Sequence, residues 1–229
     1  MIACLGDSIT AGRPGESYIK YLHSRNDYHN HGCSGETLSG LSTRIDSFIN
    51  QSTYHDVIIE IGVNDILLPY LRGHSAAWNH KVHNIILRGS IPLSQVDDFK
   101  REYEKLIWKL EDKKVKIISI PCIGEVINSD LNQKVDEYND SIQELCEKYH
   151  ITYIDFNKWQ KKTIGLSEFR SNYFISPSIY GIMIDSVLST KLGLSDFISK
   201  IRRLVVTIDG VHLNKYGAQN LARLIQKKD

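Results

Sequence analysis

Residues 1–12, MIACLGDSITAG, decide how the rest of the chain is interpreted. The apolar run at residues 2–5 ends at Gly6, which is typical of a short strand buried in a parallel sheet. Asp7 and Ser8 follow at the turn that leads into a helical pattern. The sequence therefore predicts a serine just past the carboxyl end of the first strand, and the question is what the chain brings near it.

Strand and helix patterns alternate along the chain. Apolar runs at 56–62, 115–121 and 151–156 are strong strand signals, and DYHNHG at 27–32 is a weak one. Helical spacing covers residues 37–50, 95–112, 129–149 and 213–227. Such alternation predicts an α/β fold with a parallel sheet and helices on both faces. Ligands bind at the carboxyl ends of the strands in these folds, so Ser8 and Asn64, each after a strand, should share one edge.

Composition bounds the class of protein. The chain has 229 residues, 41% hydrophobic and 24% charged, which suits a single globular domain over residues 1–229. A net charge of +1 argues against a nucleic-acid partner. We expect no membrane span, because no apolar run approaches about 18 residues. The start lacks a signal-peptide pattern, so we expect a cytoplasmic protein.

The four cysteines show neither CxxC pairs nor metal-ligand spacing. We expect them to be reduced and mostly buried, with Cys33 packed beside the site, and we expect no metal. His74, His80 and His83 could converge on one helix, but no carboxylate cluster accompanies them and a metal site there is disfavoured.

Two long segments, at about 67–94 and 158–204, exceed what a minimal five-strand layout needs. We expect helices in both. Because the segments adjoin Asn64 and Asp209, they are expected to form a cap with an apolar acyl pocket near Ser8. The apolar content of the second segment would serve a homodimer interface equally well.

Ser8 becomes chemically interesting through residues 209–212, DGVH. A serine hydroxyl needs a base within hydrogen-bond reach, and the base needs an orienting partner. Asp209 and His212, three positions apart, can supply both. An attacked carbonyl also needs donors for its oxyanion, and the candidates are the N–H groups of Ser8 and Gly35 and the amide of Asn64.

Four ordered blocks give the sequence a family resemblance. GDSIT at 6–10, CSGET at 33–37, GVND at 62–65 and DGVH at 209–212 resemble the SGNH hydrolases, also called the GDSL esterase/lipase family. The third block has Val63 where the family commonly has a second glycine, at a position that varies. The resemblance implies a three-layer α/β/α sandwich with a five-stranded parallel sheet, flavodoxin-like in order, carrying helical insertions.

The resemblance also implies roles for individual residues. Ser8 would be the nucleophile, His212 the general base and Asp209 its orienting partner. The oxyanion hole would comprise the N–H groups of Ser8 and Gly35 and the side chain of Asn64. The implied function is a serine hydrolase that cleaves small-molecule carboxylic esters through an acyl-enzyme, with no cofactor. Two alternatives stay open: acyl transfer by the same triad, and a non-catalytic binding module on this scaffold.

Overall fold

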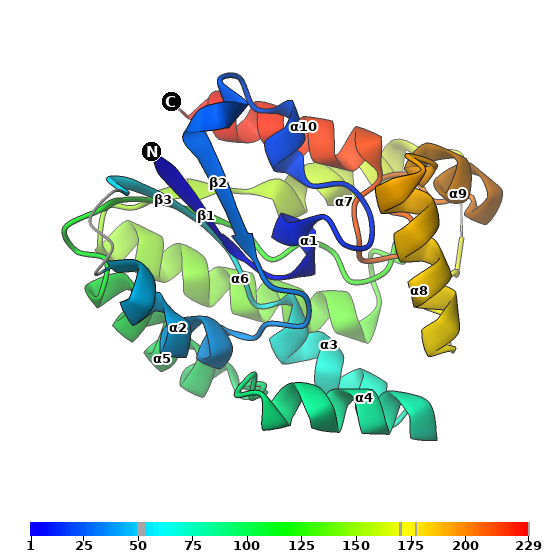
Figure 1. Ribbon diagram of the computed structural model, residues 1–229, viewed down its shortest axis with the longest axis horizontal. Coiled ribbons are helices and arrows are strands. Elements are labelled where there is room, and N and C mark those ends of the chain that lie inside the picture. The colour runs from blue at the N-terminus through cyan, green and yellow to red at the C-terminus, as the bar shows by residue number, and fades with distance from the viewer. Residues whose placement is uncertain (50–53, 170, 177, 229) are drawn as a thin grey trace.

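A single five-stranded parallel sheet organises the computed structural model, which describes residues 1–49, 54–169, 171–176 and 178–228. The strands lie in the order β2-β1-β3-β4-β5 (Figure 1). Their bounds are β1 Ile2–Gly6, β2 Tyr28–Gly32, β3 Asp56–Glu60, β4 Lys114–Ile118 and β5 Thr152–Ile154. The expected flavodoxin-like order is confirmed. Residues 50–53, 170, 177 and 229 of the expected domain, including the end of the helix expected at 37–50, lie outside the described residues.

The strength of the strand signal follows burial in the sheet for β1, β3 and β2, whereas β5, at the other edge, gives a strong signal although it is only partly buried. The central strands β1 and β3 are buried from their second residue onward, which is why they read as continuous apolar runs. The edge strand β2 is only partly buried and tolerates the polar sequence YHNHG. Its weak signal therefore reflects that polar sequence.

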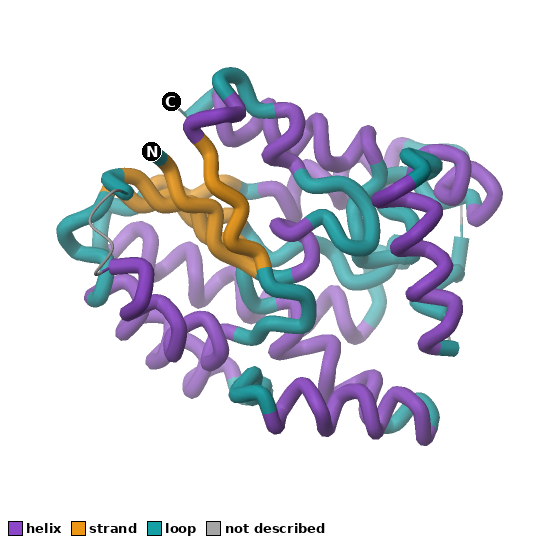
Figure 2. The backbone as a smooth tube through the Cα atoms, in the orientation of Figure 1, coloured by secondary structure: helices purple, strands orange, loops and turns teal. Residues whose placement is uncertain are grey.

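Helices cover both faces of the sheet, as Figure 2 shows with the strands lying between them. One layer contains α2 (Leu38–Ile49), α5 (Val96–Trp108) and α6 (Asp130–Lys148), which pack against one another. The other contains the 3₁₀ helix η1 (Tyr18–Tyr21), α7 (Phe156–Leu166) and α10 (Lys215–Gln226). A second 3₁₀ turn, η2, covers Arg25–Asp27. The expected three-layer sandwich is confirmed.

The remaining helices stand at the carboxyl edge of the sheet. The short α1 (Ser8–Ala11) follows β1, and α3 (Val63–Arg72) follows β3. The first long segment contributes the end of α3 and all of α4 (Ala76–Leu87). The second contributes α8 (Ile179–Ser186), the π-helical turn η3 (Val187–Lys191) and α9 (Ser195–Arg202). In Figure 1, α4 and α8 lie on either side of the edge where α1 begins.

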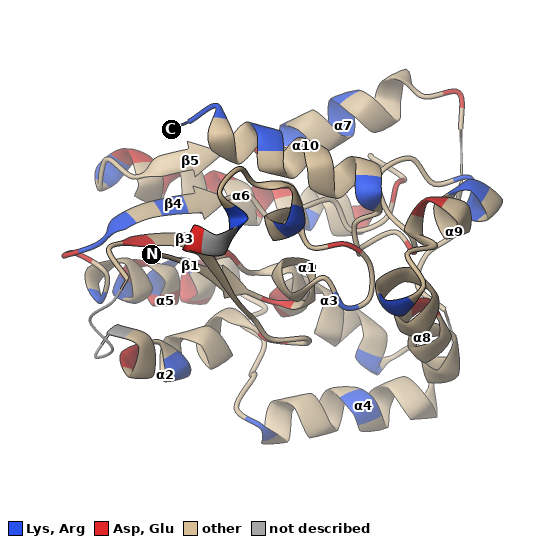
Figure 3. Ribbon diagram, turned by 45° about the horizontal axis from the view of Figure 1, so that its top comes forward, with Lys and Arg blue, Asp and Glu red and all other residues tan. Residues whose placement is uncertain are grey.

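Charge is spread over the helices. In the view of Figure 3, basic and acidic residues are interspersed rather than gathered on one element. No helix in the described part of the chain combines the length and apolar character that crossing a bilayer requires.

Candidate active site

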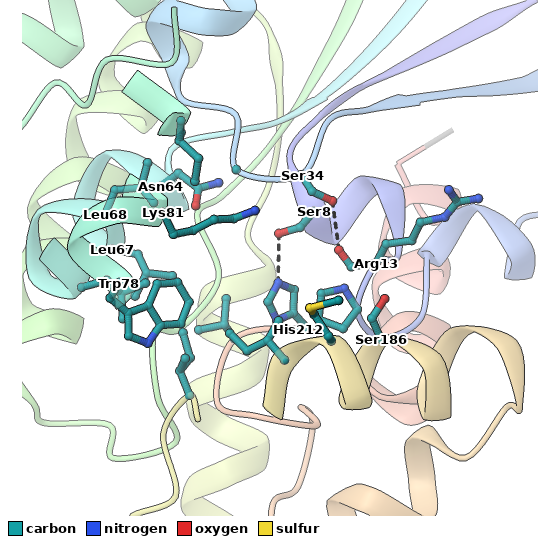
Figure 4. Close-up of a pocket in the computed structure, with 18 residues that line it drawn as sticks. Ser8, Arg13, Ser34, Asn64, Leu67, Leu68, Trp78, Lys81, Ser186 and His212 are labelled. Atoms are coloured by element: carbon teal, nitrogen blue, oxygen red, sulfur yellow. Dashed lines mark hydrogen bonds between the residues drawn. The ribbon is translucent and has the colours of Figure 1, made fainter. Parts of the chain in front are cut away.

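Ser8 occupies the turn between β1 and α1. Gly6 makes this turn possible, because a Cβ there would lie 2.2 Å from the carbonyl oxygen of Glu60 on the neighbouring strand. Asp7 caps α1 by accepting a hydrogen bond from the N–H of Ile9 at 2.9 Å. The Ser8 side chain faces a cavity (Figure 4), although the residue is only 8% exposed.

His212 and Asp209 meet Ser8 in a chain of hydrogen bonds. Nε2 of His212 lies 3.0 Å from Oγ of Ser8, and Nδ1 lies 2.7 Å from Oδ2 of Asp209. Oδ1 of Asp209 accepts the backbone N–H of His212 at 2.8 Å and that of Val211 at 3.0 Å, which fixes the carboxylate in its own loop. A proton on Nδ1 of His212 leaves Nε2 as the acceptor for the serine hydroxyl.

The environment shifts the pKa values of this pair in opposite directions. Burial alone would lower the pKa of His212, but the adjacent Asp209 carboxylate outweighs burial and holds it above 6.5. For Asp209, burial favours the neutral form, and the attraction of His212 together with its hydrogen bonds brings the pKa below 3.8. Asp209 is thus ionised at neutral pH.

Glu125, which the sequence analysis did not single out, holds the segment that leads into Asp209. Its buried carboxylate accepts the N–H groups of Val205 at 2.6 Å, Val206 at 2.9 Å and Thr207 at 3.0 Å. It also accepts the Thr207 hydroxyl at 2.7 Å. The signal that could have found it is its place after β4, at the same edge of the sheet as Ser8.

Ser8, Gly35 and Asn64, which carry the donors expected for the oxyanion, all line the cavity. The backbone N–H groups of Ser8 and Gly35 donate to no other described residue. Gly35 has φ +83, a conformation that strains any residue with a side chain. The amide of Asn64 donates to the carbonyl oxygen of Glu36 at 2.9 Å and, over a longer distance of 3.3 Å, to Oδ2 of Asp7.

Buried carboxyl groups lie directly behind these donors. Burial and the nearby Glu60 carboxyl raise the pKa of Asp7 well above its usual value. Burial raises the pKa of Glu60 to about 7 and that of Asp65 to about 7. Asp65 accepts the N–H groups of Leu38 and Leu93, both at 2.9 Å, and so ties the start of α2 to α3.

Both long segments line the cavity in front of Ser8, which has a volume of about 290 Å³. Its apolar wall comes from α3, α4 and the region around α8: Leu67, Leu68, Leu71, Trp78, Ile85, Ile175, Ile182 and Met183. Nε1 of Trp78 donates to the carbonyl oxygen of Ser176 at 3.2 Å, which joins the two segments. Trp78 is buried and also forms part of the cavity wall.

The other candidate residues stay outside this cavity. Within the described residues, no group of three or more His, Cys, Asp or Glu side chains could hold a metal ion. Cys4, Cys122 and Cys146 are buried free thiols, in line with the expectation. Cys33 is exposed, so the prediction that it packs beside the site is wrong: the loop before Gly35 presents it to solvent.

Comparison with solved structures yields relatives of the same fold. An acetyl xylan esterase, AlAXEase, matches with a TM-score of 0.66 at 19% identity, covering 99% of this chain and 98% of its own. The acetylxylan esterase Axe2 from Geobacillus stearothermophilus matches with 0.64 at 17%, covering 99% and 92%. A lipase/acylhydrolase from Enterococcus faecalis matches with 0.62 at 19%, covering 99% and 94%. No curated protein matches the sequence.

Family membership rests on the sequence itself. A family model described as the GDSL-like Lipase/Acylhydrolase family matches residues 4–219, which include all four of the sequence blocks noted above. This chain belongs to the GDSL-like Lipase/Acylhydrolase family and is a carboxylic ester hydrolase.

Proposed function

We propose that the protein is a serine hydrolase in which Ser8, His212 and Asp209 act as a catalytic triad. Nε2 of His212 takes the proton from the Ser8 hydroxyl as Oγ attacks the ester carbonyl, and Asp209 stabilises the imidazolium that forms. His212 then protonates the leaving alcohol. Water, activated by the same imidazole, releases the acid from the acyl-enzyme and regenerates Ser8. The observation that carries this proposal is the 3.0 Å contact from His212 to Ser8, continued at 2.7 Å to Asp209, at the floor of a cavity.

The oxyanion is stabilised by three groups in this proposal. The N–H groups of Ser8 and Gly35 are supplied by the backbone without any rearrangement. The amide of Asn64 gives up its longer hydrogen bond, 3.3 Å to Asp7, and donates to the oxyanion instead. Its 2.9 Å hydrogen bond to the carbonyl oxygen of Glu36 holds the amide in place. The raised pKa of Asp7 favours this exchange, because a neutral carboxyl group holds the amide less tightly than a carboxylate does.

The apolar wall of the cavity is the proposed acyl site, and the two segments at 67–94 and 158–204 act as its cap within a single domain. A cavity of about 290 Å³ favours short acyl chains. Acetyl esters, including acetylated sugars, belong in the first substrate panel because two of the structural relatives are acetyl xylan esterases. We place the enzyme in a reducing compartment, the cytoplasm, on the basis of its four free thiols.

The test combines covalent labelling with a graded ester panel. A fluorophosphonate probe should label the wild type at Ser8, and Ser8→Ala should abolish both labelling and hydrolysis of acetyl to octanoyl esters while folding normally. The matched control is Ser47→Ala, which removes an exposed serine of α2. Labelling that persists in Ser8→Ala, or hydrolysis near the wild-type rate, would reject Ser8 as the nucleophile.

A further inference from the structure

One face of α4 forms part of the cavity wall and carries a positive charge. Trp78, Lys81 and Ile85 are spaced three and four residues apart, so they lie on the same side of the helix, and all three line the cavity. Val82, beside them, is 1% exposed and packs into the core. Lys81 is exposed at the rim of the cavity and is the charged member of this otherwise apolar set.

The ammonium group of Lys81 has no partner within the described residues: it makes neither an ion pair nor a hydrogen bond there. Figure 4 shows the side chain extended across the cavity, with Nζ directed toward Ser8. Arg13 also lines the cavity, but its guanidinium extends away from Ser8 in the same view. Lys81 is thus the flexible cation that faces the reacting centre.

No carboxylate among the lining residues offsets this charge. Two acidic residues adjacent in sequence to lining residues have other partners. Glu36, next to Gly35, pairs with Arg44 at 2.6 Å, and Asp7, next to Ser8, is buried and accepts the N–H of Ile9 through Oδ1. An unpaired ammonium over an apolar cavity creates a positive potential at the cavity entrance, which favours ligands of the opposite charge.

We propose that Lys81 binds an anionic group of the substrate, so that the site prefers carboxylic esters that also carry a carboxylate or a phosphate. Either anion suits an ammonium, which acts as a point charge with three rotatable donors. The proposal rests on the proposed function, because it assumes that the ester carbonyl is bound at Ser8. Lys81 would select the substrate and take no part in proton transfer.

Matched esters test the preference kinetically. On the alcohol side, 4-acetoxybenzoate and 4-acetoxyphenyl phosphate are compared with neutral 4-acetoxybenzamide; on the acyl side, phenyl hydrogen adipate is compared with phenyl hexanoate. The ratio of kcat/KM for anionic over neutral esters should fall by about 5- to 20-fold in Lys81→Met and invert in Lys81→Glu. The preference should weaken with salt. Arg88→Met, which removes an exposed charge just beyond α4 and outside the cavity, should keep the wild-type ratio.

Calorimetry on the Ser8→Ala background separates this inference from the catalytic proposal. The anionic esters should bind more tightly than their neutral partners, and the added Lys81→Met change should remove the difference. An unchanged ratio and equal affinities on both the alcohol and the acyl side would overturn the role of Lys81, even if neutral esters are hydrolysed. Anion-selective binding without turnover in the wild type would support Lys81 and reject the proposed function instead. The carboxylate and phosphate arms show which anion is preferred.

Discussion

Replacing Glu60 with glutamine should remove one distinct contribution to the pH dependence of stability between about pH 5 and 8. Glu60 ends β3, is completely buried and accepts the hydroxyl of Thr10 at 3.1 Å through Oε2. Its Oε1 has no hydrogen-bond partner among the described residues. Burial therefore favours the protonated form of Glu60, and the contacts with Thr10 and Asp7, which lower its pKa, do not offset burial.

The magnitude follows from the shift in pKa. The folded protein keeps the Glu60 proton up to about pH 7, whereas an unperturbed glutamate loses it near 4.5. The folded state thus binds more protons than the unfolded state in this window, and the free energy of unfolding falls as pH rises through it. The loss amounts to roughly 3 kcal/mol for one fully buried group with this shift. Glutamine keeps an acceptor for Thr10 and cannot ionise, so this contribution should vanish.

Urea unfolding, followed by tryptophan fluorescence at several pH values, measures the effect. At about pH 5 the Glu60→Gln variant and the wild type should differ by no more than about 1 kcal/mol, and at pH 8 the variant should be the more stable by up to roughly 3 kcal/mol. Glu111→Gln removes an exposed carboxylate and should run parallel to the wild type. If the Glu60→Gln curve also ran parallel to the wild type, the buried-proton reasoning would be refuted.

Three further predictions concern catalysis. Asn64→Ala should lower kcat by about 10²- to 10³-fold with KM nearly unchanged, because an oxyanion donor acts in the transition state; a raised KM with normal kcat would assign Asn64 to substrate binding. The kcat/KM should rise with pH through a transition above 6.5, because Asp209 holds the pKa of His212 above that value and only the neutral imidazole is a base. Asp209→Asn should move this transition to lower pH. An unmoved transition would contradict this account. Glu125→Gln should lower the free energy of unfolding in urea by about 1–3 kcal/mol and reduce kcat more than it raises KM, since one amide oxygen cannot accept four hydrogen bonds. A wild-type kcat would show that the loop before Asp209 keeps its conformation without the carboxylate.

The sequence predicted the sheet and its catalytic edge because both depend on local patterns. Buried parallel strands produce continuous apolar runs, and the motif residues follow strand ends directly, so the proximity of Ser8 and Asn64 could be inferred from alternation alone. The prediction located α3 less well. The helix begins at Val63, immediately after the glycine at 62 with φ +125, so Asn64 lies in the first turn of a helix and not in a free loop.

Long-range contacts supplied what the sequence could not. Glu125 lies about 80 positions from its hydrogen-bond partners in the sequence. No local sequence pattern indicates which distant loop a glutamate after a strand will contact. The Trp78 contact to Ser176 spans a similar range. Lys81 also looked like an ordinary surface lysine, because its orientation depends on how α4 packs against α3. Tertiary packing therefore decides which side chains meet at the carboxyl ends of the strands.

The loops at the catalytic edge share one structural device, a buried carboxyl group that accepts backbone N–H groups. Asp7 accepts one at the start of α1, Asp65 accepts one from α2 and another from the loop before α5, and Asp209 accepts two within its own turn. Glu125 accepts three from the strand-like segment before that turn. A carboxylate can satisfy several neighbouring donors at once, which is what a turn without a regular partner needs. The backbone donors of these turns are therefore satisfied without a regular helix or strand partner.

Hydrogen bonds attach the two segments of the proposed cap to the scaffold and to each other. The N–H of Gly15 donates to the hydroxyl of Ser189 at 2.9 Å, and the indole of Trp78 donates to the carbonyl of Ser176 at 3.2 Å. Single neutral hydrogen bonds of this kind contribute about 1 kcal/mol each, roughly half of what a charge-assisted bond provides. Charge-assisted bonds also hold these segments: Nη1 of Arg202 donates to the carbonyl oxygen of Ile208 at 2.8 Å, and the N–H of Leu93 donates to Oδ1 of Asp65 at 2.9 Å. If the proposed function and the proposal for Lys81 hold, substrate preference is set by these two segments, whereas the turns that hold Ser8, Asp209 and His212 set the chemistry.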